Sequence, residues 1–367
     1  MRATAAAILE TVDVQVDGTR PWDIQVRDER FFRRALTEGA LGLGESYMEG
    51  WWEAASVDEL FARLARLDPR RIPIPWSLKW LLLQDRVVNR QRRSRAHRIG
   101  EHHYDLGNDL FRAMLDPRMA YSCGYWKDAR TLAEAQEAKL DLVCRKLGLR
   151  AGQRVLDIGC GWGSFVRFAA ERYGVTALGV NNSAEQTALG RELCAGLPVE
   201  IRQQDYRDVT GTFDHIVSIG MFEHVGPRNY RTYFEVARRC LREDGLFLLH
   251  TIGSHAAGKT VDAWTEKYIF PDGAQPSIGQ IAGAIEGRFV MEDWHNIGAD
   301  YDPTLMAWFA NFEAAWGELR ARYDDVFYRM WKYFLLSCAG SFRARRNNVW
   351  QVVLSPHGVP GGYRGVR

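Results

Sequence analysis

Residues 155–163 restrict the fold of this chain more than any other segment. They read VLDIGCGWG, so an apolar run around Asp157 leads directly into glycines at positions 159, 161 and 163. The apolar run predicts the end of a buried parallel strand, and the glycines remove side chains where the backbone must turn and touch a ligand. We therefore expect an open α/β sheet with a ligand pocket at the end of this strand.

The spacing of these glycines narrows the kind of ligand. Dinucleotide-binding folds carry G-x-G-x-x-G, whereas this chain has G-x-G-x-G after Asp157 and Ile158. That pattern resembles motif I of the class I S-adenosylmethionine-dependent methyltransferases. The resemblance implies S-adenosylmethionine as cofactor, with Gly159 and Gly161 against it. The alternative is an ordinary glycine-rich turn between a strand and a helix.

The chain alternates between strand and helix patterns, as a sheet covered by helices requires. We predict helices over 131–147, from 164 and from 183, and strands over 154–158, 175–180, 199–203, 213–219, 245–251, 288–295 and 350–354. Residues 256–285, with their glycines, prolines and aromatics, are expected to form an insertion over the pocket. The expected fold is of the α/β class, a Rossmann-like class I methyltransferase domain with a helical insertion.

A chain of 367 residues is long for one compact unit, so we expect a smaller domain beside the large one. Residues 1–85 contain two alternating runs, at 12–16 and 22–26, followed by helical patterns. They indicate a small α+β or mostly helical amino-terminal domain. Residues 86–99 are predicted to be a basic linker, and residues 100–367 the catalytic domain.

The composition restricts where the protein can act. The net charge is +2, and no run approaches the roughly 20 apolar residues that cross a bilayer. The six cysteines show no C-x-x-C spacing, so neither a zinc site nor a disulfide framework is predicted, and a cytoplasmic location is expected. Any contact with lipid must then come from the membrane surface.

A cluster of arginines follows the tryptophan-bearing segment at 76–80 and predicts docking to anionic lipid. It consists of Arg86, Arg90, Arg92, Arg93, Arg95 and Arg98. A solvated connector between domains is the alternative. Nucleic acid is not expected as a partner, because no recognisable binding module accompanies the charge.

Polar residues follow the next two predicted strands, at the edge where a ligand would lie. Asn181 follows the first of them, and Asp205 and Tyr206 follow the second. An aspartate that accepts from an amino group, beside an aromatic ring, fits adenine recognition, and solvated turn residues are the alternative. Most class I methyltransferases carry an acidic residue where this chain has Asn181, whose amide can still donate to and accept from a ribose.

Six further segments, in order along the chain, indicate a closer resemblance. They are HYDLGN at 103–108, YSCGYW at 121–126, MFEHVG at 221–226, HTIG at 250–253, GADYD at 298–302 and CAG at 338–340. Together they resemble the bacterial cyclopropane-fatty-acyl-phospholipid synthases, relatives of the mycolic acid cyclopropane synthases. The resemblance implies methyl transfer from S-adenosylmethionine to a cis double bond in a phospholipid acyl chain, and closure of a cyclopropane ring.

That chemistry constrains the reaction centre. A methylated alkene is a carbocation, so water must be excluded and a base must remove a proton from the new methyl group. The resemblance implies a bicarbonate ion as this base, surrounded by Cys123, Glu223, His250, Tyr301 and Cys338. Glu223 would accept from the bicarbonate hydroxyl, and His250 and Tyr301 would orient the ion. Taken singly, a buried cysteine is usually a small core residue, and the chemistry requires no covalent role for Cys338.

The same resemblance implies which residues line the cofactor: Tyr121, Ser122, Gly159, Gly161, Asn181, Gln186, Asp205 and Tyr206. Five aromatic residues could surround the acyl chain: Tyr125, Trp264, Tyr268, Phe270 and Tyr301. For all of them except Tyr301, ordinary core packing is the favoured interpretation. The family also implies an unsaturated phospholipid at the membrane surface as substrate, and a homodimer. Two alternatives stay open, a lipid methyltransferase with a methyl-branched or methylene product and a non-catalytic lipid-binding relative.

Overall fold

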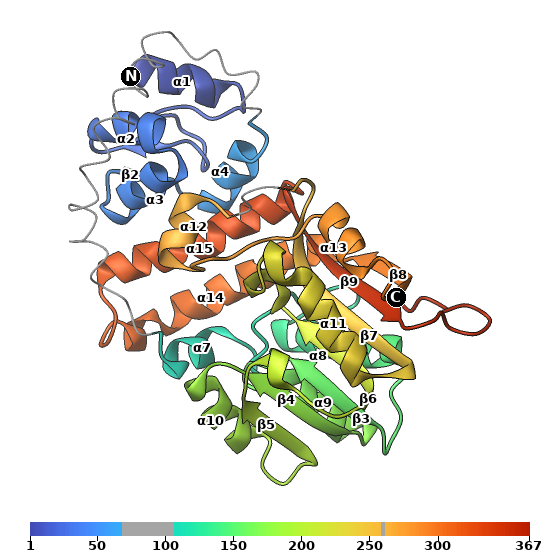
Figure 1. The fold of residues 1–367 in the computed structure, drawn as a ribbon. Helices are drawn as coiled ribbons and strands as arrows, with labels where there is room; N and C mark the ends of the chain where they lie inside the picture. Colours follow the sequence, from blue (N-terminus) through green and yellow to red (C-terminus); the bar gives the residue numbers. More distant parts are fainter. Residues whose placement is uncertain (68–105, 258–260) are drawn as a thin grey trace.

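The computed structural model describes residues 1–67, 106–257 and 261–367. Figure 1 shows a helical amino-terminal part, a larger α/β part, and the long helices α14 (Tyr301–Leu319) and α15 (Asp325–Arg343) between them. The predicted linker at 86–99 lies outside the described residues. In the part of the chain that is described, no helix is long and apolar enough to cross a membrane.

One mixed sheet organises the α/β part. Among the described residues its strands lie in the order β5-β4-β3-β6-β7-β9-β8. They are β3 (Arg154–Ile158), β4 (Thr176–Asn181), β5 (Val199–Gln203), β6 (Phe213–Ile219), β7 (Leu241–Ser254), β8 (Val290–Asn296) and β9 (Asn347–Ser355). Strands β3 to β7 are parallel, and β9 is antiparallel to both neighbours. The strand order reverses on either side of β3, where an open α/β sheet binds its ligand.

Helices cover both faces of this sheet. They are α8 (Leu132–Leu147) and α9 (Ser164–Tyr173) on one face, and α11 (Tyr230–Cys240) and α13 (Ile278–Ile285) on the other. Successive side chains of a strand point to opposite faces of the sheet. Val155 therefore packs in the core beside α8, and Leu156 packs in the core beside α11. The predicted helix at 131–147 is confirmed, and Thr131 caps it by accepting from the Glu134 amide.

The amino-terminal part is mostly helical. It contains α1 (Arg2–Glu10), α2 (Arg30–Glu38), α3 (Ala40–Met48) and α4 (Val57–Leu64), with a short sheet of β1 (Gln25–Val26) and β2 (Trp52–Glu53). The alternating run at 12–16 forms no strand. Its one β-bridge among the described residues joins Val16 to Ile24. A run this short has no neighbouring strand with which to extend a ladder.

The amino-terminal helices share one hydrophobic core with α7 (Asn108–Met114), α14 and α15. Trp52 lies edge-on to Tyr333 of α15, with ring centroids 6.5 Å apart. A β-carbon added to Gly340 of α15 would lie 2.2 Å from the Asp58 carbonyl oxygen, so the backbones of α15 and α4 are in close contact. This part therefore buries its apolar faces against the rest of the chain.

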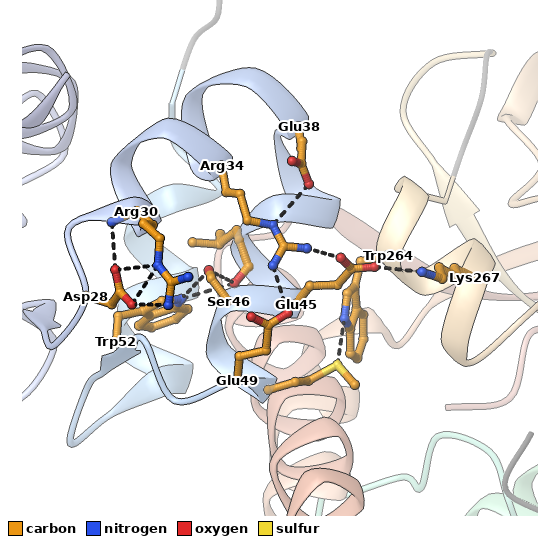
Figure 2. A network of polar contacts seen from close by, with 12 residues as sticks. Asp28, Arg30, Arg34, Glu38, Glu45, Ser46, Glu49, Trp52, Trp264 and Lys267 are labelled. Carbon is orange, nitrogen blue, oxygen red and sulfur yellow. Dashed lines mark hydrogen bonds and ion pairs between the residues drawn. The ribbon is translucent and has the colours of Figure 1, made fainter. Parts of the chain in front are cut away.

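The insertion after β7 is tied to the amino-terminal helices by the polar network in Figure 2. Arg34 pairs with three carboxylates, those of Glu38, Glu45 and Glu49. Glu45 also accepts from Lys267, at 2.7 Å, and from Tyr268, at 3.0 Å. Both of those residues lie on α12 (Ala263–Tyr268), so the network joins α3 to the insertion.

Candidate active site

The glycine turn lies at the carboxyl end of β3, as predicted. Gly159 and Gly161 have φ values of +87° and +55°, a backbone region that favours glycine. A β-carbon on Gly159 would lie 2.4 Å from Cβ of Met221, whereas no atom of the described residues lies within 4 Å of one built on Gly161. The turn therefore packs tightly on one side and leaves backbone exposed to a ligand on the other.

Asn181, at the end of β4, holds this turn in place. Its Nδ2 atom donates to the Gly161 carbonyl at 3.2 Å and to Gln186 Oε1 at 2.9 Å, and its Oδ1 accepts from the Ser183 amide. Ser183 caps α10 (Ala184–Leu193) by accepting from the Gln186 amide, but the Gln186 side chain turns to Asn181 instead of completing a capping box. The structure thus brings Gly161, Asn181 and Gln186 together.

Asp205 and Tyr206 lie at the end of β5. Asp205 accepts from the Arg207 backbone amide at 2.9 Å and from its guanidinium at 2.6 Å, and these bonds lower the pKa of Asp205. Tyr206 is buried in the core beside α11, with its ring centroid 5.4 Å from that of Tyr233. Asp205 is therefore an ionised acceptor at the sheet edge, and adenine contact by the two residues stays a prediction.

Tyr121 and Ser122 precede α8 and approach the same edge. The ring of Tyr121 packs 5.1 Å from those of Phe111 and Trp308. Ser122 is buried, and its hydroxyl oxygen accepts from Lys139 Nζ at 2.9 Å. Lys139 was not predicted from the sequence, although a lysine inside the apolar repeat of 131–147 was the available signal.

Tyr301, the first residue of α14, brings most of the predicted catalytic residues together. Burial raises the pKa of its hydroxyl well above the usual range, and four neighbours raise it further: Cys123, Tyr121, Glu223 and Cys338. These groups come from separate segments of the chain and lie within electrostatic range of one hydroxyl. With Tyr301 itself, the structure therefore gathers four of the five predicted catalytic residues, and Tyr121 from the predicted cofactor lining lies with them.

Glu223 lies in the short 3-10 helix η3 (Phe222–His224) that follows β6. Its Oε1 accepts from the Ile252 amide at 2.6 Å, whereas its buried Oε2 has no hydrogen-bond partner among the described residues. Burial raises the pKa of this carboxyl to about 7. The insertion contacts the same loop, because the Ala274 amide donates to the Glu223 carbonyl at 2.8 Å.

His250 lies on β7 and is 2% exposed. Burial lowers the pKa of its imidazole well below the usual value, and the charges of Lys139 and Lys146 lower it further. Lys139 also lies within electrostatic range of Cys123. The ring is therefore neutral at pH 7 and can donate from only one nitrogen.

The two predicted site cysteines are neutral thiols. Cys123 is fully buried, with Sγ 3.2 Å from the Gly124 carbonyl oxygen, and burial raises its pKa. Burial raises the pKa of Cys338 to about 12. Because the thiolate is the nucleophilic form, neither environment activates a cysteine for covalent catalysis.

Two of the aromatic residues considered for the acyl chain face the amino-terminal part. Trp264 is 1% exposed, and its indole nitrogen lies 3.4 Å from the sulfur of Met48 in α3. Tyr268 donates to Glu45, as described above. Ordinary packing between α12 and its neighbours therefore accounts for both side chains.

A comparison with protein families agrees with this geometry. The model of the mycolic acid cyclopropane synthetase family matches residues 91–352. The chain belongs to this family. The resemblance predicted from six short segments is confirmed, and the family region includes the glycine turn and every predicted site residue.

Similarity extends beyond the family region. The chain is 52% identical to the cyclopropane-fatty-acyl-phospholipid synthase of Escherichia coli strain K12 over 364 residues, which is 99% of this chain and 95% of that protein. The cyclopropane synthase MmaA2 from Mycobacterium tuberculosis is 32% identical, has a TM-score of 0.65, and matches over 69% of this chain and 95% of its own. The mycolic acid cyclopropane synthase CmaA1 complexed with SAH and CTAB has a TM-score of 0.63 at 34% identity, with the same coverage. The class I methyltransferase fold is confirmed.

Proposed function

We propose that this chain transfers a methyl group from S-adenosylmethionine to the cis double bond of an unsaturated phospholipid acyl chain and closes a cyclopropane ring. Its similarity to the E. coli synthase over almost the whole chain supports this activity. The observation that carries the proposal is the Glu223 carboxylate. One oxygen is fixed by the Ile252 amide, and the other is buried and unpartnered among the described residues. The carboxyl group lies within electrostatic range of Tyr301. Ring closure needs a proton acceptor in such a position.

The sheet edge fits S-adenosylmethionine, which supplies the methyl group when bound. The open face of Gly161 lets a ligand approach the backbone, and Asn181 and Asp205 present polar atoms along the same edge. We propose that the cofactor is held by Tyr121, Ser122, Gly159, Gly161, Asn181, Gln186, Asp205 and Tyr206. SAH in the CmaA1 structure supports a cofactor of this class.

We propose bicarbonate as a second bound molecule, which supplies a small anion able to take up a proton. The unpartnered Oε2 of Glu223 fits a hydroxyl donor, and the protonated hydroxyl of Tyr301 fits an oxyanion. Glu223 accepts a hydrogen bond and draws the proton toward itself, while His250 and Tyr301 donate and hold the orientation. Cys123 and Cys338 contribute mainly close packing contacts around the bicarbonate.

The aromatic lining excludes water from the cationic reaction centre. The ring of Tyr301 lies 4.6 Å from that of Phe342 and 5.8 Å from that of Trp308, centroid to centroid. The faces of such rings attract positive charge, by about 0.5–2 kcal/mol each. Together they stabilise a cation without offering it a nucleophile.

Purified protein, S-adenosylmethionine with a labelled methyl group, and vesicles of unsaturated phospholipid test the proposal. We expect label in lipid, and proton NMR of the fatty acid methyl esters should show a cyclopropane. A methyl-branched or methylene chain would overturn ring closure but not methyl transfer. Unlabelled lipid would overturn the enzyme proposal in favour of a lipid-binding protein.

We further propose that the protein acts in the cytoplasm, docked as a homodimer on the inner face of the cell membrane. The cluster of arginines between 86 and 98 supports docking, although it lies outside the described residues. Replacing these arginines by glutamine should weaken sedimentation with anionic vesicles, and unchanged binding at low salt would overturn docking. A monomer in sedimentation velocity would overturn the dimer.

A further inference from the structure

Two lysines on the sheet-facing side of α8 are almost completely buried. Lys139 and Lys146 are each 1% exposed, and each has polar partners, as a buried ammonium group requires. Lys146 contacts β8, with Nζ 3.1 Å from His295 Nδ1 and 3.5 Å from Asp293 Oδ2. Lys139 instead reaches Ser122, in the segment predicted to line the cofactor.

The bond between Lys139 and Ser122 has a defined direction. An ammonium group only donates, so the Ser122 hydroxyl oxygen must accept, and its own proton points to another acceptor. Gln136 Nε2 donates to the Ser122 carbonyl at 2.8 Å and fixes the backbone. Ser122 is therefore held as a hydrogen-bond donor.

That donor lies at the ligand-binding edge of the sheet. A β-carbon built on Gly220, the residue after β6, would lie 3.9 Å from Cβ of Ser122. Strand β6 pairs with β3, so Ser122 is close to the point where the strand order reverses. The carboxylate of the methionyl group is the anionic acceptor that S-adenosylmethionine would bring to this edge.

We propose that Lys139 is a positioning residue that holds the Ser122 hydroxyl as a donor to the methionyl carboxylate of S-adenosylmethionine. The inference rests on the proposed function, which places this cofactor at the sheet edge. Lys139 acts through Ser122 and does not itself contact the cofactor. Burial lowers the pKa of Lys139 to about 8, and Asp116 and Asp157, within electrostatic range, partly offset this effect, so the amine is mostly protonated at pH 7.

Isothermal titration of the full chain with S-adenosylmethionine, and with its decarboxylated analogue, tests this role. Loss of one hydrogen bond to a carboxylate should raise the Kd by about 10-fold in Ser122→Ala and in Lys139→Met. Because both changes remove the same interaction, the double variant should bind no more than about 3-fold weaker than either single variant. The analogue lacks the carboxylate. Its Kd for the two single variants and the double variant should therefore be nearly the same as its Kd for the wild-type chain.

Lys146→Met is the matched control, since it removes an equally buried lysine from the same helix without touching Ser122. Its Kd for S-adenosylmethionine should stay within about 3-fold of wild type, and circular dichroism should show that every variant is folded. Wild-type affinity in Lys139→Met, multiplicative effects in the double variant, or an equal loss with the analogue would overturn the role of Lys139 alone. Failure of the wild-type chain to bind S-adenosylmethionine would overturn the proposed function.

Discussion

Gln351 Nε2 lies 3.3 Å from His250 Nδ1, and the two residues are paired in register across β9 and β7. Both side chains are buried on the sheet face that α8 covers. An amide N–H that donates to Nδ1 places the single proton of a neutral imidazole on Nε2. With its amide nitrogen facing Nδ1, Gln351 favours the His250 tautomer that donates from Nε2.

Gln351→Glu should reverse this arrangement. A carboxylate accepts from Nδ1–H, so the proton would move to Nδ1 and turnover should fall by about 100-fold. Proton–nitrogen NMR of histidine-labelled protein reports the tautomer directly. Gln153→Glu is the matched control, because Gln153 lies 3.1 Å from His215 at the other end of the sheet. Equal losses in the two variants would contradict a role for the tautomer.

Glu223→Gln should abolish most turnover and spare the cofactor. Removing a positioned proton acceptor costs about 10²- to 10⁴-fold, whereas the amide keeps the shape of the side chain. The Kd for S-adenosylmethionine should stay near wild type in isothermal titration, while incorporation of labelled methyl into lipid is lost. Near-normal turnover would mean that another group accepts the proton.

The buried Glu223 should also make stability depend on pH. Its pKa is about 7 when folded and near 4.5 when unfolded, so the folded state binds this proton more tightly. The stabilisation is complete below pH 4.5 and is lost as the pH rises through about 7, a change on the order of 3 kcal/mol.

Urea unfolding at pH 5 and pH 8, without bicarbonate, measures this effect. The loss of stability between the two values should be smaller in Glu223→Gln than in wild type. It should not vanish, because burial also raises the pKa of Asp157 to about 7. Parallel pH profiles for the two proteins would contradict the assignment.

Cys338→Ser should keep turnover within about 10-fold of wild type. A thiol with a pKa of about 12 is ionised in only about one molecule in 10⁵ at pH 7, so it is no nucleophile there. Steady-state assays of the variant, and slow alkylation of Cys338 followed by mass spectrometry, provide the measurements. Complete inactivity of a folded Cys338→Ser protein would restore a chemical role for sulfur.

Gly44→Ala should loosen the contact between α3 and α12. The added β-carbon would lie 2.3 Å from Cδ1 of Trp264, and overpacking of this kind costs about 1–3 kcal/mol. Gly283→Ala in α13 is the control, because no atom of the described residues lies within 4 Å of its added carbon, and helix propensity should stabilise it by about 0.5–1 kcal/mol. Urea denaturation compares the two, and destabilisation of equal size would contradict the contact.

Local patterns predicted the elements around the pocket well. The strands at 154–158, 199–203 and 213–219 match the structure residue for residue. Each apolar run ends at a turn formed by residues next to it in the sequence, so the local pattern is enough to place the end of the strand. Asn181 and Gln186 were both noted from the sequence. Their mutual hydrogen bond was not, because it depends on how the first turn of α10 folds back on the end of β4.

Contacts between distant segments could not be predicted. Lys139 meets Ser122, and Gln351 meets His250, 101 positions away, through the pairing of strands and helices that only the folded chain defines. The short run at 12–16 showed strand alternation but no partner, and formed only a bridge. Such pairings depend on tertiary packing, which overrides local propensity.

The close contact between Gly340 and α4 has a consequence for recombining this protein with its homologues. Gly340 lies only two positions after Cys338, so one stretch of α15 meets the amino-terminal helices and carries a predicted reaction-centre residue. A chimaera that joins the amino-terminal helices of one homologue to the sheet of another must therefore take α15 from the same parent as α4.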